Sequence, residues 1–350
     1  MTESKRTRVL IVDDSAFARK VLRETLAASP ELEVVGFARD GLEALERIAE
    51  LKPDVVTLDL VMPNLDGIGV LRALHPGAGP RVVIVSISDA NSALAIEALQ
   101  MGAIDLVHKP TALATDRLFE LGPELAAKVI AAGRARAVIG MPAVPRLPTS
   151  LAEPARPGRT AGQVRLVVVG TSTGGPQALT RLVTALPGDL PCAVAVALHI
   201  PAGYTEALAR RLNDASAVTV FEASENVVLA PGSVAIARGG QHLRLRAEGG
   251  QLITHLQGNS SGAPFCPSVD LLFASAAAAL GPAVLGVVLT GMGNDGVEGA
   301  RAIAAAGGRT LTESEASCVV YGMPRAVAEA GLSVGQARIE DMAAAIVRHL

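Results

Sequence analysis

Several residue types are scarce in this sequence of 350 residues, and each shortage argues against a class of protein. There is no tryptophan, and aromatic residues make up only 2% of the chain, so we expect no stacking platform for single-stranded nucleic acid. The three cysteines, Cys192, Cys266 and Cys318, are scattered and lack the CxxC spacing of zinc sites. We therefore expect reduced thiols and no zinc site. A net charge of −3 also argues against a partner nucleic acid.

Long hydrophobic runs are missing as well. No apolar stretch is long enough to span a bilayer, and the N-terminus leads into a short predicted strand without the pattern of a signal peptide. We therefore expect a cytoplasmic protein without membrane insertion. Half of the residues are hydrophobic and 19% are charged, which is typical of a globular chain, and the length suggests two domains.

From residue 8 onward, short apolar runs alternate with helical patterns. This alternation predicts a parallel, doubly wound sheet with helices between its strands. The predicted strands are 9–12, 34–37, 55–58, 82–85 and 104–107, and the predicted helices lie near 15–28, 41–51, 65–74 and 92–101.

Polar residues follow these strands at their carboxyl ends, where such sheets bind ligands. They are Asp13, Asp14, Asp59, Ser86 and Lys109. Three carboxylates at one edge repel each other unless a cation joins them, and oxygen ligands suit Mg²⁺. A hydroxyl and an ammonium opposite them can hold a phosphoryl group. Any single Asp after a strand is often only a helix N-cap, but that does not explain all five together.

These stretches resemble a response-regulator receiver domain, with residues 9–15 (VLIVDDS), 59–67 (DLVMPNLDG) and 109–110 (KP) carrying the similarity. The resemblance implies a flavodoxin-like fold in which Asp59 accepts a phosphoryl group from a sensor histidine kinase. It also implies that Asp13, Asp14, Asp59 and the Val61 carbonyl hold Mg²⁺, and that Ser86 and Lys109 contact the phosphoryl group. Receivers often carry an aromatic switch residue where this chain has Leu106.

A Pro-, Ala- and Arg-rich stretch separates this domain from the rest. Prolines at this density disfavour helix and sheet, so we expect an extended tether. We predict a receiver domain over 1–130, a linker over 131–163 and a second domain over 164–350. The basic charge of the linker is either a recruitment signal or the ordinary charge of a solvated tether.

The second domain is organised around residues 170–176 (GTSTGGP), which follow a buried strand and precede a helical pattern. The Gly-x-Ser-x-Gly spacing is that of a nucleophile elbow, which leaves Ser172 exposed beyond a strand. Pro176 suits the first turn of a helix, whose free N–H groups attract negative charge. The alternative is a glycine-rich phosphate cradle, but neither a P-loop Lys nor the dinucleotide-binding fingerprint is present.

Further strands and helices follow the elbow. We predict strands at 192–198, 218–221, 284–289 and 309–312, an antiparallel ribbon over 233–256 with turns at 239–240 and 249–250, and helices near 204–213, 269–280, 297–306, 322–330 and 338–349. The fold class is therefore α/β, a Rossmann-like domain that carries a ribbon.

Ser172, His199 and Asp295 each follow a predicted buried strand. In a parallel sheet those ends share one edge, so the three can form a nucleophile, a base and an orienting acid. His199 can also be a capping or core histidine, and Asp295 an N-cap. His242 and His255 are alternative bases, but they lie in the predicted ribbon.

Residues 164–349 resemble the catalytic domain of the chemotaxis protein-glutamate methylesterase family (CheB). The matching stretches are 170–175 (GTSTGG), 199–204 (HIPAGY), 267–270 (PSVD), 290–296 (TGMGNDG) and 315–324 (EASCVVYGMP). The resemblance implies that Ser172 is the nucleophile, His199 the general base and Asp295 its partner. It further implies that the Met292 N–H belongs to the oxyanion hole and that Thr173 helps to hold the histidine.

The family resemblance implies a phosphorylation-regulated hydrolase that removes methyl esters from glutamyl residues of chemoreceptors, releases methanol and can deamidate receptor glutamines. No cofactor is expected for catalysis itself. We also expect the unphosphorylated receiver to cover the Ser172 edge. Two positions depart from the family: Cys266 stands where an Arg is usual, and Arg238 where a Pro is usual. The alternative function is a non-enzymatic response regulator whose second domain binds a partner.

Overall fold

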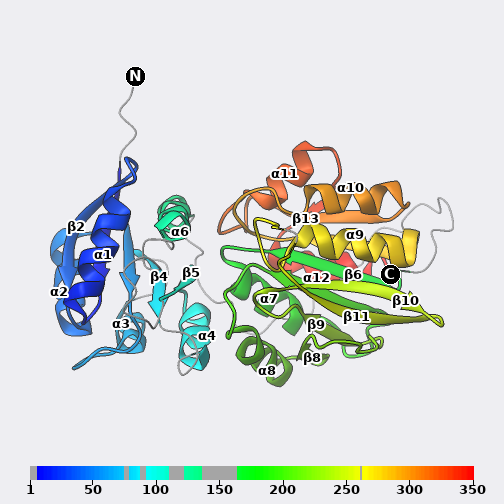
Figure 1. Cartoon of the computed structure of the whole chain (residues 1–350), viewed down its shortest axis with the longest axis horizontal. Coiled ribbons are helices and arrows are strands. Elements are labelled where there is room, and N and C mark those ends of the chain that lie inside the picture. The colour runs from blue at the N-terminus through cyan, green and yellow to red at the C-terminus, as the bar shows by residue number, and fades with distance from the viewer. Residues whose placement is uncertain (1–5, 75–78, 87–91, 110–121, 136–163, 261) are drawn as a thin grey trace.

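The computed structural model describes residues 6–74, 79–86, 92–109, 122–135, 164–260 and 262–350. These residues form two α/β domains that lie side by side (Figure 1). Pro110 and residues 136–163 of the predicted linker lie outside this part of the chain.

The first domain is built on a parallel sheet with the strand order β2-β1-β3-β4-β5, which confirms the predicted doubly wound arrangement. Its strands are β1 (Thr7–Val12), β2 (Leu32–Ala38), β3 (Val55–Leu58), β4 (Arg81–Ser86) and β5 (Asp105–His108). Helices α1 (Ala16–Ala27) and α6 (Gly122–Arg134) pack on one face, and α2 (Gly41–Leu51), α3 (Gly67–Ala73) and α4 (Ser92–Gln100) pack on the other. Helix α6 continues to Arg134, so the helical part of this domain extends past residue 130, where we predicted the linker to begin.

The second domain contains a parallel sheet in the order β14-β13-β12-β6-β7-β9-β8. Its strands are β6 (Leu166–Thr171), β7 (Ala193–Leu198), β8 (Thr219–Glu222), β9 (Ser233–Ile236), β12 (Val284–Val288), β13 (Arg309–Glu313) and β14 (Gly335–Ala337). Helices α7 (Gly175–Thr184), α8 (Thr205–Ala215) and α12 (Ile339–Val347) pack on one face. Helices α9 (Val269–Leu280), which runs into the short 3₁₀ turn Gly281–Ala283, α10 (Val297–Ala305) and α11 (Met323–Glu329) pack on the other.

The antiparallel ribbon is shorter than we predicted. It is a hairpin of β10 (Gln241–Glu248) and β11 (Gln251–Gly258), and it turns at Gly249 and Gly250, which both have positive φ. Strand β9, which we had assigned to the ribbon, instead pairs in parallel with β7 and β8. All four residues of β9 are buried, which is typical of a strand covered on both faces of a parallel sheet.

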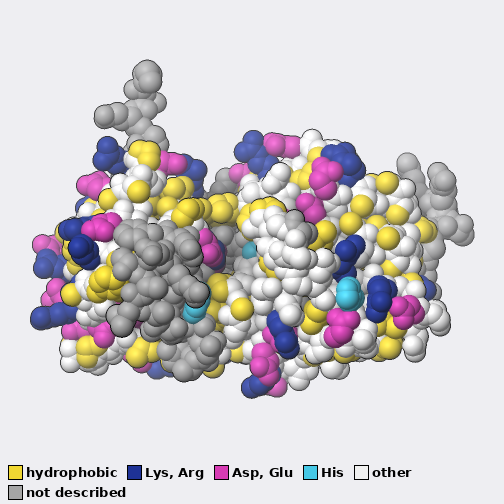
Figure 2. All heavy atoms as spheres, viewed as in Figure 1, with side chains coloured by type: hydrophobic (Ala, Val, Ile, Leu, Met, Phe, Trp, Pro, Cys, Tyr) yellow, Lys and Arg dark blue, Asp and Glu magenta, His cyan; other side chains and the backbone are white. Residues whose placement is uncertain are grey.

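The two domains share an apolar contact. Helix α4 of the first domain packs against α7 and α8 of the second, and a single cluster of buried residues includes Leu99 and Leu179, one from each side. Figure 2 shows basic and acidic groups interspersed over the visible face, and surface pairs such as Arg325 and Glu329 combine the two signs.

Candidate active site

Ser172 lies in a tight turn between β6 and α7. Its N–H donates to the Thr290 carbonyl at 3.0 Å, and its own carbonyl accepts the Gly175 N–H at 2.7 Å. Gly174 has a φ of +77°, which glycine adopts without steric cost, and a Cβ at this position would lie 2.6 Å from the Cβ of Val319. The strand-to-helix turn predicted from the sequence is therefore present.

His199 lies beside Ser172 because of the strand register. Thr171 pairs with Leu198 across β6 and β7, so the residues that follow them leave the sheet at neighbouring strand ends. The His199 N–H donates to the Thr171 carbonyl at 3.0 Å, which extends this pairing by one residue. In the ring, Nε2 lies 2.8 Å from Asp295 Oδ2.

The Asp295 carboxylate has four donors around it. Oδ2 accepts from the Val269 N–H at 2.8 Å as well as from His199, and Oδ1 accepts from the Asp270 N–H at 2.9 Å and from Ser268 Oγ at 3.3 Å. Burial acts to raise the pKa of Asp295, but the hydrogen bond and charge of His199, together with the backbone donors, outweigh burial and lower it. Asp295 is therefore an ionised acceptor.

This arrangement assigns the histidine tautomer. An ionised carboxylate can only accept, so in the neutral imidazole His199 Nε2 carries the hydrogen and Nδ1 carries the lone pair. Among the described residues, Nδ1 is buried and has no hydrogen-bond partner. A buried polar atom without a partner costs free energy, and Nδ1 is the ring atom that remains available to accept a proton. Catalytic hydrogen bonds are often long before substrate binds, and a Ser172–His199 bond is not among those formed in the described residues.

The turn after β12 closes the other side of Ser172. A Cβ on Gly291 would lie 2.8 Å from the Ser172 Cβ, so only glycine allows this approach. Met292, whose N–H we predicted for the oxyanion hole, follows directly. Thr290 joins the two turns, because its Oγ1 donates to the Thr173 carbonyl at 3.0 Å.

Thr173 differs from its predicted role in this structure. Its hydroxyl donates to Asp105 Oδ2 of the first domain at 2.7 Å, and no hydrogen bond to His199 is formed within the described chain. The other oxygen of Asp105 is paired with Lys128 Nζ, at 3.1 Å. The contact with the histidine that we expected is thus replaced by a contact between the domains.

The two alternative histidines are engaged elsewhere. His242 is buried, accepts the Ser268 N–H on Nδ1 at 3.2 Å and lies 3.2 Å from Asn259 Oδ1 through Nε2. His255 is paired with Glu225 at 2.8 Å. Neither ring is hydrogen-bonded to Asp295 in the described structure, so the geometry favours His199 as the base.

A second polar cluster lies at the carboxyl edge of the first sheet. Lys109 Nζ is 2.5 Å from Asp13 Oδ2 and 2.8 Å from Asp59 Oδ2. Burial acts to lower the pKa of Lys109, but the charges of Asp59 and Asp13 outweigh it and raise the pKa, so the side chain is an ammonium. Burial raises the pKa of Asp13 in spite of Lys109.

The remaining predicted residues of this cluster lie around it. One oxygen from each of Asp13, Asp14 and Asp59 falls within 4.8 Å of the others, and carboxylate oxygens in this number fit Mg²⁺. The Val61 N–H donates to Asp59 Oδ1 at 3.3 Å, and Ser86 is buried at the end of β4. The cluster therefore brings three carboxylates and the Lys109 ammonium together at this edge of the sheet.

The first domain contacts the loop that carries Ser172. The Gly174 N–H donates to the Ile104 carbonyl at 3.1 Å, and Gln177 Nε2 donates to the carbonyls of Ala103, at 2.7 Å, and Leu99, at 3.0 Å. Ser172 is only 8% exposed, so the predicted exposure of this serine is wrong for the docked arrangement of the two domains. The α4–β5 loop of the first domain thus lies directly against the predicted nucleophile turn.

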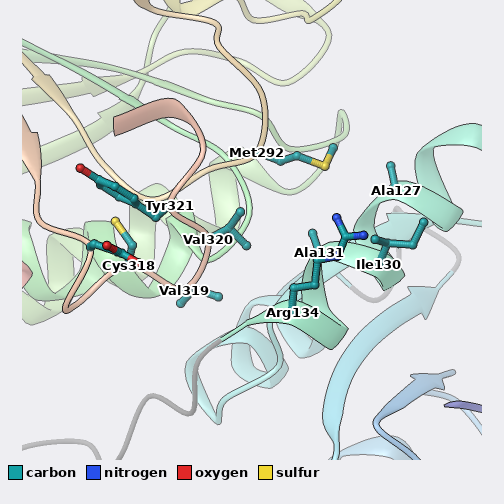
Figure 3. Close-up of a pocket in the computed structure, with 10 residues that line it drawn as sticks. Ala127, Ile130, Ala131, Arg134, Met292, Cys318, Val319, Val320 and Tyr321 are labelled. Carbon is teal, nitrogen blue, oxygen red and sulfur yellow. The ribbon is translucent and has the colours of Figure 1, made fainter. Parts of the chain in front are cut away.

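A cavity of about 420 Å³ lies beside this contact. Met292 and Val320 line it from the second domain, across from Ile130 and Ala131 of α6 (Figure 3). The space adjoining the Met292 turn is therefore bounded by both domains.

Together, the acidic cluster on one sheet edge and the Ser–His–Asp arrangement on the other define a class: a response regulator whose output domain is a serine hydrolase. Comparisons with known proteins agree. Residues 9–120 match the family model of the response regulator receiver domain, and residues 167–346 match the model described as CheB methylesterase.

Individual relatives match over all or nearly all of the chain. Protein-glutamate methylesterase/protein-glutamine glutaminase 5 of Myxococcus xanthus is 59% identical, with 100% of each chain covered. Protein-glutamate methylesterase/protein-glutamine glutaminase of Thermotoga maritima is 40% identical, with 93% of each chain covered. The crystal structure of the T. maritima CheB methylesterase catalytic domain matches at 34% identity with a TM-score of 0.52, and covers 54% of this chain and 100% of that one. The chain belongs to the CheB methylesterase family.

Sequence reasoning missed several residues at this site. Ser268 and Asp270 entered only as part of a family motif, although Ser before an apolar helix is a recognisable N-cap. Asp105 and Gln177 carried no signal, because their role depends on how the two domains dock.

Within the part of the chain that the structure describes, none of the helices combines the length and the apolar character that a membrane span needs.

Proposed function

We propose that this protein is a phosphorylation-regulated protein-glutamate methylesterase that hydrolyses glutamyl methyl esters of chemoreceptors in the cytoplasm. The observation that carries the chemistry is the His199 ring, at the strand end next to that of Ser172, with Nε2 held by Asp295 and Nδ1 left free. The names of the full-length relatives support the substrate class, and they support deamidation of receptor glutamines by the same site.

Each residue of the site has its own role in the reaction. Ser172 Oγ attacks the ester carbonyl carbon while its proton passes to His199 Nδ1, and Asp295 stabilises the imidazolium that forms. Backbone N–H groups, that of Met292 among them, receive the negative charge of the tetrahedral oxygen. His199 then donates the proton to the departing methanol. Water, activated by the same nitrogen, attacks the acyl-enzyme, which releases the glutamate side chain and restores Ser172.

The test is methanol release from methylated receptor membranes. Replacing the nucleophile of such a triad lowers turnover by about 10⁶-fold, so Ser172→Ala should release no methanol above background. Ser224→Ala, at an exposed serine of the same domain, should match the wild type. Unchanged methanol release by purified, folded Ser172→Ala would contradict the assignment.

The second candidate is a non-enzymatic response regulator whose second domain only binds a partner. Cys266, in place of the usual Arg, was the sequence feature that suggested it. The four donors around Asp295 argue for the enzyme, because a binding module has no need to hold a carboxylate ionised against a histidine. Methanol release separates the two.

We further propose that a sensor histidine kinase phosphorylates Asp59. Asp13, Asp14, Asp59 and the Val61 carbonyl would hold Mg²⁺, which neutralises charge between the carboxylates and the incoming phosphoryl group. Ser86 and Lys109 would then bind the phosphoryl oxygens. The acidic cluster, in which Lys109 is paired with Asp13 and Asp59, supports this assignment.

Asp59→Asn tests the phosphorylation site. With Mg²⁺ and a small acyl phosphate, methanol release by the wild type should rise, whereas release by Asp59→Asn should stay at its unstimulated rate. Asp66→Asn is a matched control, because asparagine also caps helices and Asp66 is the N-cap of α3. Stimulation of Asp59→Asn equal to that of the wild type would rule out Asp59 as the acceptor.

We also propose that the unphosphorylated receiver restricts access to Ser172. The hydrogen bonds from Thr173, Gly174 and Gln177 to the first domain support this proposal, as does the low exposure of Ser172. A phosphoryl group at Asp59 adds a charge of about −2 and draws on Lys109 at the end of β5, the strand that begins at Asp105.

A further inference from the structure

Phe265 covers one face of the His199 ring. The two ring centroids are 4.3 Å apart and the ring planes differ by 9°, so the rings are stacked. Phe265 is half-buried and lies between the hairpin and α9. Neither the motifs of the sequence nor the triad geometry calls for an aromatic residue here.

A single hydrogen bond leaves the His199 ring partly free. The bond from Nε2 to Asp295 holds one ring atom, but it does not by itself set the plane of the ring. A parallel aromatic neighbour does set the plane, because stacked rings interact best within a narrow range of distance and tilt. With both contacts in place, the direction of the Nδ1 lone pair is determined.

The segment that carries Phe265 also holds Asp295. Ser268 Oγ and the N–H groups of Val269 and Asp270 donate to the two carboxylate oxygens. Residues 265–270 therefore contact both partners of the hydrogen bond, the acid from the start of α9 and the histidine from just before it. A shift of this segment would move both together.

The stack also matches the charge that forms in the reaction. As His199 takes the serine proton it becomes an imidazolium, and the face of an aromatic ring attracts a cation more strongly than a neutral group. An interaction that is stronger in the transition state than in the ground state raises kcat rather than lowering KM. Phe265 also shields the His199 ring from water, and Nδ1 of that ring is itself buried.

We propose that Phe265 is a positioning residue that sets the plane of the His199 ring and stabilises its protonated form. This inference rests on the proposed function, because it assigns a role in that same reaction. Substrate need not touch Phe265 for this role, which distinguishes it from a specificity contact.

The kinetic test compares three variants of the full-length protein, with Mg²⁺, an acyl phosphate and methylated receptor membranes. Phe265→Leu keeps an apolar side chain but removes the stack, and a misplaced catalytic group typically costs up to about 100-fold. We expect kcat to fall between about 10- and 100-fold, with KM changed less than about twofold. Phe265→Tyr keeps the ring and should stay within about threefold of the wild type in kcat. Phe221→Leu, the same change at another half-buried phenylalanine of the domain, should leave kcat unchanged.

A spectroscopic test needs no substrate and begins with the wild type. The ring current of a stacked Phe265 shifts the His199 ring protons upfield, and this shift should be lost in Phe265→Leu and kept in Phe265→Tyr. Absence of the upfield shift in the wild type would overturn the inference even if Phe265→Leu failed to fold.

The remaining outcomes separate this inference from the proposed function. A rise in KM at constant kcat would overturn the positioning role, because it indicates uniform substrate binding. Equal kcat values for Phe265→Leu, Phe221→Leu and the wild type would also overturn the positioning role. In that case, loss of methanol release in Ser172→Ala would still support the proposed hydrolase. A wild type that releases no methanol would instead reject the proposed function, and the positioning role with it.

Discussion

At the scale of single residues, two neighbouring carboxylates each accept hydrogen bonds from the start of a helix. Asp295, which precedes α10, binds the start of α9, and Asp270, which lies in α9, binds the start of α10. Asp295 accepts the first N–H groups of α9, and Asp270 Oδ1 accepts the N–H groups of Gly296, at 2.9 Å, and Gly299, at 2.7 Å, where α10 begins. The two acids therefore lie close together. Burial, and to a lesser degree the charge of Asp295, raises the pKa of Asp270 to about 6.

This raised pKa makes the free energy of unfolding depend on pH. The unfolded chain releases the Asp270 proton near its ordinary value of 3.8, whereas the native protein keeps it up to about 6. Asp270 therefore contributes stability at low pH that is lost as the pH rises from about 4 through about 6.

Asp270→Asn removes this dependence, because the amide oxygen can still accept both N–H groups but carries no charge. The melting temperature of the variant minus that of the wild type should be larger at pH 8 than at pH 5. Asp214→Asn, at an exposed aspartate of α8, should show no such change. A difference between variant and wild type that is the same at both pH values would contradict the raised pKa.

At the scale of secondary-structure elements, the start of α9 has two tasks. Ser268 Oγ accepts the Leu271 N–H at 3.3 Å, which caps the helix, and lies 3.3 Å from Asp295 Oδ1, to which it donates. The helix N-terminus also favours the negative charge of Asp295. Loss of the cap should therefore affect stability and catalysis together.

Ser268→Ala should lower the free energy of unfolding by about 1 kcal/mol, the usual cost of an N-cap. For a domain of this size that corresponds to a melting temperature lower by about 2–4 °C. The kcat for methanol release should fall as well, because Asp295 loses one of its donors. Ser268→Thr retains the hydroxyl and should restore both properties. An alanine variant as stable as the wild type would show that the cap contributes nothing.

At the scale of the whole molecule, the two domains meet at the β6–α7 turn. The first domain offers three backbone carbonyls and the Asp105 carboxylate, and the second offers donors from Thr173, Gly174 and Gln177. Gln177 is the useful probe of this contact, because it lies on α7 outside the proposed catalytic machinery.

Gln177→Ala removes two hydrogen bonds between the domains, each contributing about 0.5–1.5 kcal/mol. If docking restricts the site, methanol release without phosphodonor should rise about tenfold, which corresponds to about 1.4 kcal/mol. The fully stimulated rate should not change. Thr184→Ala is the control, because the Thr184 hydroxyl donates to the Thr180 and Arg181 carbonyls of the same helix. An unstimulated rate equal to that of the wild type would argue that docking does not limit access.

The sequence predicted much of this arrangement because strand ends are easy to locate. Runs of buried residues marked β6 and β7, and the parallel sheet then required Ser172 and His199 to leave it at one edge, as the register of Thr171 with Leu198 shows. Strand β9 was misassigned because four buried residues carry no periodicity that separates a ribbon from a central strand.

What the sequence determined by itself is the order of strands, helices and turn residues along the chain, and with it the two sheet edges that carry Asp59 and Ser172. These follow from local periodicity and from residues that tolerate only certain backbone angles, such as Gly174. Tertiary structure decided the contacts of each side chain at those edges. Thr173 contacts Asp105, and Asp295 holds His199, across 68 and 96 positions of chain. Such contacts depend on the spatial order of the strands within each sheet and on domain docking, because local propensity does not reach across that distance.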